Sequence, residues 1–252
     1  MKTPRTSALL GNASPAESAF ARGLEMRRVA TRAEWSQARS LRYEALRQRG
    51  EIESSDEAGY GDKHDAALNS VTFLLSRNDA PLGSTRSSVS SANRRWLLPA
   101  SETFEREIQS SIGLDSTIVE ASLMVVQPDA TVDPKNALFH LFKAHMLHCA
   151  MENADWLVVA VRDSQIGFYR RMFNMEILSG AEKYPGMASP RVLMGFEYRQ
   201  QAPVVFKRIP AMAVTEADER DFAASGVITF DARRAAAPQR RSETPPYLVA
   251  GD

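Results

Sequence analysis

Short apolar runs and longer amphipathic segments alternate along the middle of the chain. Apolar runs bounded by Asn, Asp, Pro and Gly are typical of strands, and apolar spacings of three and four residues are typical of helices. Strands are expected at residues 24–30, 71–77, 82–89, 117–126, 155–161, 175–181 and 191–198. Helices are expected at residues 32–48, 101–112, 134–151, 164–172 and 215–224. This order predicts an α/β (α+β) fold with a mixed sheet.

Short polar side chains mark the starts of several predicted helices. Thr31 and Glu34 have the spacing of a capping box, in which each side chain satisfies a backbone amide of the first turn. Asp133-Pro134 is a favourable N-cap and first-turn pair. The remaining expected N-caps are Ser101 and Ser164.

Composition divides the chain into three parts. Residues 1–22 are rich in Ser, Ala, Pro and Thr and are expected to form a disordered tail. Residues 23–200 carry all the predicted strands and most of the helices, so we expect one domain there. Residues 201–252 are expected to form a C-terminal extension that is partly helical or disordered.

Charge and cysteine content narrow the classes of function. The chain has 31 basic and 31 acidic side chains, which gives no support for nucleic-acid binding. A single cysteine, Cys149, excludes an intrachain disulfide and suits a reducing compartment. The longest apolar run, Trp156 to Val161, is too short to span a bilayer, and no integral membrane segment is expected. These features predict a soluble, cytoplasmic protein.

One carboxylate, Glu120, stands in the strand-like run from Thr117 to Val126. Burial in a sheet removes water from an ionised carboxylate, so this group must be paired or have a raised pKa. A Glu with a raised pKa can accept a proton from an amine near neutral pH. The alternatives are a partly solvated strand face and a structural ion pair with an arginine.

Strict alternation along this strand sets which side chains share a face with Glu120. Side chains two residues apart point to the same side of a sheet. Ser122 and Met124 are therefore expected beside Glu120, with Ser122 as a polar neighbour in a cleft. The full expected face is Ile118, Glu120, Ser122, Met124 and Val126.

Two arginines and two aspartates are candidates for a charged site. Arg42 lies next to the apolar stripe of the first helix, and Arg86 lies on the second strand of the hairpin. An arginine on a mid-sheet strand makes a good fork for a carboxylate. Asp62 and Asp65 lie in the polar loop between them. The alternative is that all four are solvated surface residues.

The helix at 134–151 contains His140, His145, His148 and Cys149 at helical spacing. Three of these could meet on one side, but apart from the isolated His64 the sequence has no second cluster to complete a tetrahedral site. We therefore expect no metal, and interpret these residues as helix-surface histidines and a core cysteine.

Tyr169 lies on the short helix that follows the buried strand at 155–161. Its hydroxyl could protonate a departing thiolate, and the alternative is simple core packing. The sequence contains no serine-histidine-acid order, zinc signature, Walker loop or GxGxxG motif. Residues 127–133 contain no glycine and two acids, which is unfavourable for binding a pyrophosphate at a helix start.

These segments, in this order, resemble the Gcn5-related N-acyltransferase superfamily. The segment "FYRRMFNMEIL" (168–178) is similar to its closing motif, with Asn174 where a glycine often stands. More narrowly, the chain resembles the acyl-homoserine lactone synthases and the N-acyl amino acid synthases of the FeeM type. The segments that carry this resemblance are "LRYEAL" (41–46), Asp62, Asp65, "GSTR" (83–86), "VEASLMVV" (119–126) and "YPGMASPRVLMGFEY" (184–198).

The resemblance implies a mostly antiparallel sheet flanked by helices and an acyltransferase that moves a fatty acyl group from a thioester to an amine. It implies acyl carrier protein as donor and partner, an amino acid or similar amine as acceptor, and no tightly bound cofactor. Glu120 would be the base, Ser122 would hold the acyl oxygen, and Tyr169 would lie near the leaving thiol. The implied substrate-binding residues are Arg42, Asp62, Asp65 and Arg86 for the acceptor, and Met124, Phe139, Leu141 and Phe142 for the acyl chain.

One departure from the lactone synthases limits the acceptor. They have an arginine three residues after the strand acid, where this chain has Leu123, and this favours an acceptor other than the homoserine-lactone precursor. Two alternatives stay open: an acyl- or acetyl-coenzyme A-dependent N-acetyltransferase, and an inactive binding module with the same fold.

Overall fold

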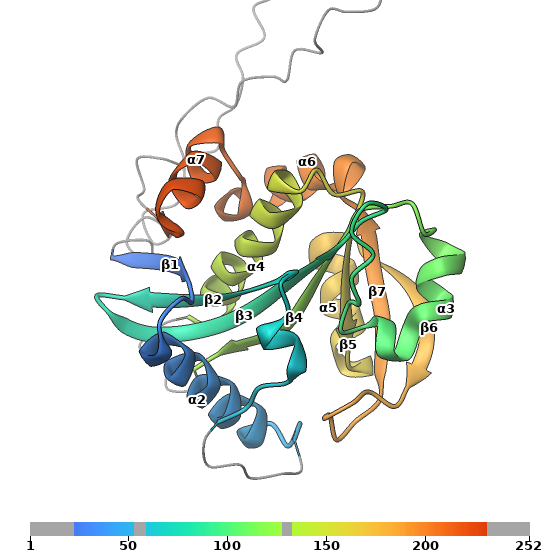
Figure 1. Ribbon diagram of the computed structural model, residues 1–252, viewed down its shortest axis with the longest axis horizontal. Helices are drawn as coiled ribbons and strands as arrows, with labels where there is room; N and C mark the ends of the chain where they lie inside the picture. Colours follow the sequence, from blue (N-terminus) through green and yellow to red (C-terminus); the bar gives the residue numbers. More distant parts are fainter. Residues whose placement is uncertain (1–22, 53–58, 128–132, 231–252) are drawn as a thin grey trace, which may run out of the picture.

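The computed structural model describes residues 23–52, 59–127 and 133–230. Within these ranges an eight-stranded sheet has helices on both faces (Figure 1). The strands are β1 Leu24–Arg28, β2 Ser70–Arg77, β3 Ala80–Ser90, β4 Ile118–Val126, β5 Trp156–Val161, β6 Glu176–Glu182, β7 Arg191–Glu197 and β8 Val227–Thr229. The helices are α2 Arg32–Gln48, η1 Lys63–Ala66, α3 Ser101–Ser111, α4 Pro134–Met151, α5 Asp163–Phe173, α6 Tyr198–Arg208, η2 Pro210–Met212 and α7 Glu216–Ser225. The predictions for residues 1–22 and 231–252 lie outside the described residues.

The strand order across the sheet is β6-β7-β5-β4-β3-β2-β1-β8. All neighbouring strands are antiparallel except β4 and β5, which are parallel and joined by α4. The predicted mixed, mostly antiparallel sheet flanked by helices is therefore confirmed. A parallel pair needs a long crossover connection, and α4 supplies it.

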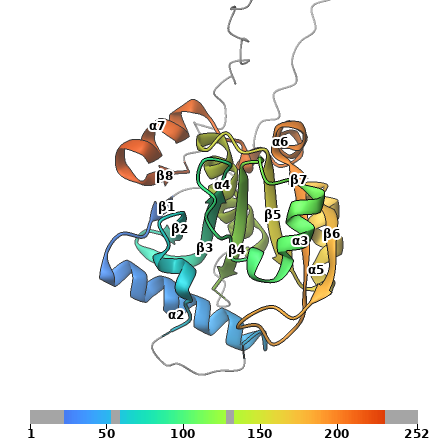
Figure 2. The same cartoon turned by 45° about the vertical axis from the view of Figure 1, so that its right-hand side comes forward.

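Two layers of helices cover the two faces of the sheet (Figures 1 and 2). On one face, Val119 and Ala121 of β4 pack with α4, α5 and α6 in a shared core. On the other face, α2 packs against Val125, and α3 packs against Ile118 and Val158. Apolar side chains on both faces make β4 and β5 central, buried strands.

A bulge in β4 changes which face its last residues occupy. Leu123 has a backbone φ of 49°, in the left-handed region that leucine rarely adopts. The register with β3 shifts at the same place, between Ser84 and Arg86. As a result Met124 and Val126 pack on the α4 face, opposite Glu120. The prediction that they share a face with Glu120 is wrong, because strict alternation does not survive a bulge.

The C-terminal part of the described chain joins the same sheet. The predicted helix at 215–224 is present as α7, which begins at a capping box between Thr215 and Asp218. The sequence patterns did not reveal α6 or the short strand β8. β8 pairs antiparallel with β1, and its Ile228 is fully buried.

Two of the four predicted N-caps are wrong. Ala100, without a side-chain cap, precedes α3, and Arg162 precedes α5, so Ser101 and Ser164 lie inside these helices. The capping box of Thr31 and Glu34 is present. The Asp133 carboxylate accepts a hydrogen bond from the Lys135 amide at 3.0 Å, as an N-cap does.

Candidate active site

The parallel strands β4 and β5 separate halfway along their length. They pair only over Ile118–Ala121 and Trp156–Val159. Beyond this point a cavity of about 470 Å³ opens between the two strands, and it is lined from the α2 and α3 side and also by Tyr169 of α5 on the opposite face. Residues 120–124 of β4 and 159–161 of β5 contribute to its lining. The loop before β7, η1 and the end of α2 close the rest of it.

Glu120 lies at the closed end of this gap and is fully buried. One carboxylate oxygen, Oε2, accepts a hydrogen bond from the Ala100 amide at 2.8 Å. The other oxygen, Oε1, has no hydrogen-bond partner within the described part of the chain. Burial raises the pKa of Glu120 to about 7, against the opposing effects of the Ala100 amide, the Arg86 guanidinium and the Tyr184 hydroxyl. The carboxyl therefore titrates near neutral pH.

Arg86 connects Glu120's strand to the loop that carries η1. Its guanidinium binds the Asp62 carboxylate through two nitrogens, with Nη2 at 3.1 Å from Oδ2, and its Nη1 lies 3.2 Å from Asp65. Its Nε donates to the Ser122 hydroxyl at 3.1 Å. Burial opposes the ionised form of Asp62, but Arg86 outweighs this effect and lowers the pKa of Asp62.

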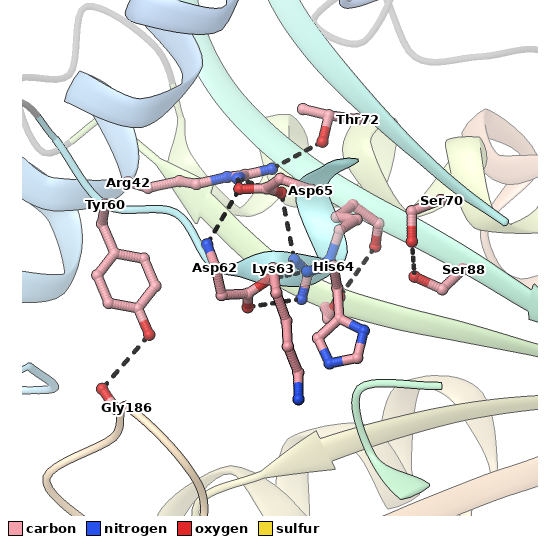
Figure 3. A network of polar contacts seen from close by, with 12 residues as sticks. Arg42, Tyr60, Asp62, Lys63, His64, Asp65, Ser70, Thr72, Ser88 and Gly186 are labelled. Carbon is pink, nitrogen blue, oxygen red and sulfur yellow. Dashed lines mark hydrogen bonds and ion pairs between the residues drawn. The ribbon is translucent and has the colours of Figure 1, made fainter. Parts of the chain in front are cut away.

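Arg42 extends the same network into the core. Its Nη1 donates to both oxygens of Asp65, at 2.8 and 2.9 Å, and its Nη2 donates to Thr72 at 3.0 Å (Figure 3). The Arg42 side chain is fully buried, so the solvated alternative does not hold for it. Asp65 therefore bridges the two arginines, and the four charged residues expected to lie together do so. Asp62 and Lys63 edge the cavity, whereas Arg42 and Asp65 support it from behind.

Two tyrosines lie on the cavity. Tyr169 of α5 lines it, and burial raises the pKa of this phenol well above its ordinary value. Tyr184, in the loop between β6 and β7, also lines it and is electrostatically coupled to Glu120. Burial raises the pKa of Tyr184 as well. Both phenols therefore carry their protons throughout the neutral range.

The expected apolar walls are only partly found. Met124 lines the cavity. Phe139 and Phe142 lie on α4 within the core that Met124 contacts, and they do not line the cavity. After the bulge at Leu123, Met124 both lines the cavity and packs against the core cluster that contains these rings. Leu141 lies deeper in the core, against Gly83.

A second charged cluster at the cavity was not predicted. Glu51, just after α2, is buried and lies 2.8 Å from Arg191, 3.4 Å from Arg162 and 3.8 Å from Arg49. Arg191 starts β7 and is buried too. Glu51 and Arg191 are 140 positions apart, so no local pattern could have paired them.

His140 and His145 of α4 are buried and the His148 side chain is 11% exposed, so the prediction that the α4 histidines lie on the helix surface is wrong. His145 contacts the Thr85 hydroxyl at 2.8 Å, and His148 contacts the Ser87 hydroxyl at 2.7 Å. Burial and the neighbouring His148 lower the pKa of His145 to about 3, and burial lowers that of His148 to about 4. Both rings are therefore neutral structural groups. Cys149 is a core residue. Within the described ranges no cluster of His, Cys, Asp or Glu is arranged to hold a metal ion.

No helix among the described residues is long and apolar enough to cross a membrane.

Comparison with known proteins shows which fold and which family this chain shares. The solved structure of FeeM, an N-acyl amino acid synthase from uncultured soil microbes, superposes with a TM-score of 0.60 at 16% identity, covering 72% of this chain and 96% of that one. The acyl-homoserine lactone synthase LasI gives 0.56 at 13% identity, covering 72% and 92%. BjaI, a CoA-dependent acyl-homoserine lactone synthase, gives 0.56 at 15% identity, covering 75% and 90%. A comparison with curated protein sequences found no match.

These likenesses confirm the fold expected from the sequence. The family follows from the sequence itself, because the family model of the N-acyl amino acid synthase FeeM matches residues 37–197, more than half of the chain. The matched range contains β4, the charged network and Tyr169. The chain therefore belongs to the FeeM family of N-acyl amino acid synthases, which are acyltransferases.

Proposed function

We propose that this protein transfers a long-chain fatty acyl group from an acyl carrier protein thioester to the amino group of an amino acid or similar amine. The observation that carries this proposal is Glu120, a buried carboxyl on the cavity with a pKa of about 7 and one oxygen without a partner. A base of this strength holds and releases protons efficiently at neutral pH.

The reaction needs three groups around the thioester. The acceptor enters as the neutral amine, and as its nitrogen attacks the thioester carbon Glu120 takes one proton from it, directly or through water. A C–N bond forms, and the negative charge moves to the carbonyl oxygen, which the Ser122 hydroxyl or a strand amide stabilises. The C–S bond then breaks, and Tyr169 protonates the leaving thiolate. Proton exchange with solvent restores Glu120 and Tyr169.

The splayed strands suit this chemistry. Backbone groups of β4 beyond Ala121 have no partner on β5, so they are available to a ligand that lies between the strands. Leu123, Met124 and Val161 give this part of the cavity an apolar wall for the acyl chain. Phe139 and Phe142 belong to the core cluster against which Met124 packs. The network of Arg42, Asp62, Asp65 and Arg86 positions the acceptor.

The start of α4 favours a carrier protein over coenzyme A as the donor. Coenzyme A carries a pyrophosphate, which binds best to free backbone amides at a helix start. Here the Asp133 carboxylate already accepts from the Lys135 amide, and Pro134 has no amide hydrogen to give. A carrier protein presents a single phosphate and does not need this site. Because the similar protein BjaI is described as CoA-dependent, the fold alone does not choose between the donors.

Mass spectrometry of lipid extracts from expressing cells tests the proposal. Long-chain N-acyl amino acids are expected with the wild-type protein and with Glu34→Gln, a matched change at the capping box of α2, away from the cavity. They should disappear with Glu120→Gln. Purified protein incubated with acyl carrier protein thioesters and with acyl-coenzyme A then identifies the donor.

The two alternative functions give different results in the same assays. Turnover of acetyl- or acyl-coenzyme A without such lipids would assign a coenzyme A-dependent N-acetyltransferase. A folded protein that is inert with every thioester and amine would assign a binding module and would refute catalysis by Glu120.

A further inference from the structure

The cluster around Glu51 carries more positive than negative charge. Arg49, Arg162 and Arg191 surround this one carboxylate, at 3.8, 3.4 and 2.8 Å. Arg191 is 4% exposed, and burial lowers its pKa against the opposing effect of Glu51. The side chains of Arg49 and Arg162 are 35% and 29% exposed, so the surplus positive charge of the cluster is within reach of a soluble anion.

The cluster and Glu120 belong to one cavity and one face of the sheet. Arg49, Glu51 and Arg191 line the same cavity as Glu120. Arg162 comes four residues after Val158, the β5 partner of Glu120, and Arg191 comes two residues before Leu193, which packs with Val158. Residues separated by an even number of positions along a strand point to the same face. Arg162 and Arg191 therefore lie on the face that Glu120 occupies.

The charges along the cavity are therefore distributed unevenly. Asp62 pairs with Arg86, and Glu102 pairs with Lys63 at 3.0 Å. Glu120 makes no ion pair within the described part of the chain, whereas the cluster around Glu51 has guanidinium groups in excess. A ligand with a positive nitrogen at one end and an anion at the other matches this distribution.

We infer that Arg191, with Arg49 and Arg162, forms the subsite that binds the carboxylate of the acceptor amino acid while its amino group faces Glu120. This inference rests on the proposed function and adds to it the basis for selecting a carboxylate-bearing amine. Guanidinium groups bind carboxylates through paired hydrogen bonds, and the same chemistry would serve the phosphate of the donor arm. The test must separate these two anions.

The test compares three acceptors: the best amino acid from a panel of the standard ones, its carboxamide and its decarboxylated amine. We expect the wild-type protein to use the amino acid at least tenfold better, in kcat/KM, than the two neutral analogues. Arg191→Gln should raise KM for the amino acid about tenfold or more and leave the analogues and the donor KM within about twofold. Arg199→Gln, at an exposed arginine outside the cavity, is the matched control and should change nothing.

Other outcomes overturn the inference. An equal loss for all three acceptors would assign Arg191 a structural role, and a rise in the donor KM alone would assign the cluster to the donor phosphate. If Arg191→Gln does not fold, Arg49→Gln, whose side chain is about one third exposed, is measured in the same way. A wild-type protein that uses the neutral analogues equally well refutes this subsite but not acyl transfer, whereas one that acylates nothing refutes the proposed function itself.

Discussion

Glu120 accepts a hydrogen bond from the Ala100 amide at 2.8 Å and thereby ties the centre of β4 to the start of α3. This contact fixes the carboxyl group, whose other oxygen makes no hydrogen bond within the described residues and has the Tyr184 hydroxyl nearby. The group thus combines a fixed position with a pKa of about 7, which is a costly arrangement for a residue that serves stability alone.

The first prediction concerns stability and pH in Glu120→Gln. The folded pKa of about 7 lies above the ordinary 4.5, so folding gains from the protonated form. This stabilisation is fully present below pH 4.5, and roughly 3 kcal/mol of it is lost as the pH rises to 7. In urea denaturation, the free energy of unfolding of Glu120→Gln should therefore increase relative to that of the wild-type protein between pH 5 and pH 8.

The control for this measurement is Glu34→Gln. Hydrogen bonds from the Ala30 and Thr31 amides lower the pKa of Glu34, so this group is ionised in both states across that range. Its stability difference from the wild-type protein should stay constant from pH 5 to pH 8. A constant difference for Glu120→Gln as well would show that Glu120 titrates normally.

The second prediction concerns the bulge at Leu123. A φ of 49° is strained for leucine and worse for a β-branched residue. Leu123→Ile should unfold at lower denaturant than Leu123→Met, with a difference of about 1–2 kcal/mol in the free energy of unfolding. Equal stabilities for the two variants would mean that β4 is regular in solution.

This bulge also shows what the sequence can and cannot predict. Period-two alternation placed Glu120 and Ser122 correctly on one face. Glu120 accepts from the Ala100 amide at the start of α3, and Ser122 accepts from the Arg86 side chain of β3. It failed at Met124, because nothing in the letters Ser-Leu-Met marks a left-handed backbone at Leu123. Hydrophobic periodicity reports regular elements well and is silent about an irregularity of one residue.

Contacts between side chains far apart in the sequence could be predicted only where a family resemblance pointed to them. The network of Arg42, Asp62, Asp65 and Arg86 was expected from the resemblance, not from spacing. Glu51 gave no such signal, and Tyr184 and Arg191 were noticed only as parts of the resembling segment at 184–198. The burial of His145 and the near-burial of His148 were also missed, because Thr85 and Ser87, which contact their rings, lie some sixty positions earlier.

The third prediction concerns Arg42. Replacing it with Met leaves the Asp65 carboxylate with only Arg86 as a cationic partner, and should cost about 3 kcal/mol of unfolding free energy. The double variant Arg42→Met/Asp65→Leu removes both charges and should recover part of this loss. Chemical denaturation measures both, and strictly additive effects would contradict a direct interaction.

The fourth prediction concerns Tyr169→Phe. The phenol keeps its proton at neutral pH, because burial raises its pKa. As the acid that protonates the thiolate, it should contribute about 10–100-fold to kcat, with little effect on folding. Single-turnover assays with the acyl thioester test this. An unchanged rate of the chemical step would show that Tyr169 only packs in the core.

The pH dependence of kcat/KM for acyl transfer, in the wild-type protein and in Glu120→Gln, tests the central claim most directly. The account predicts that the wild-type rate rises with pH through an apparent pKa near 7, as Glu120 loses its proton. Glu120→Gln should be at least 100-fold slower and lack this limb. A variant that keeps both the rate and the same limb would contradict the account, because the proton would then be taken by another group.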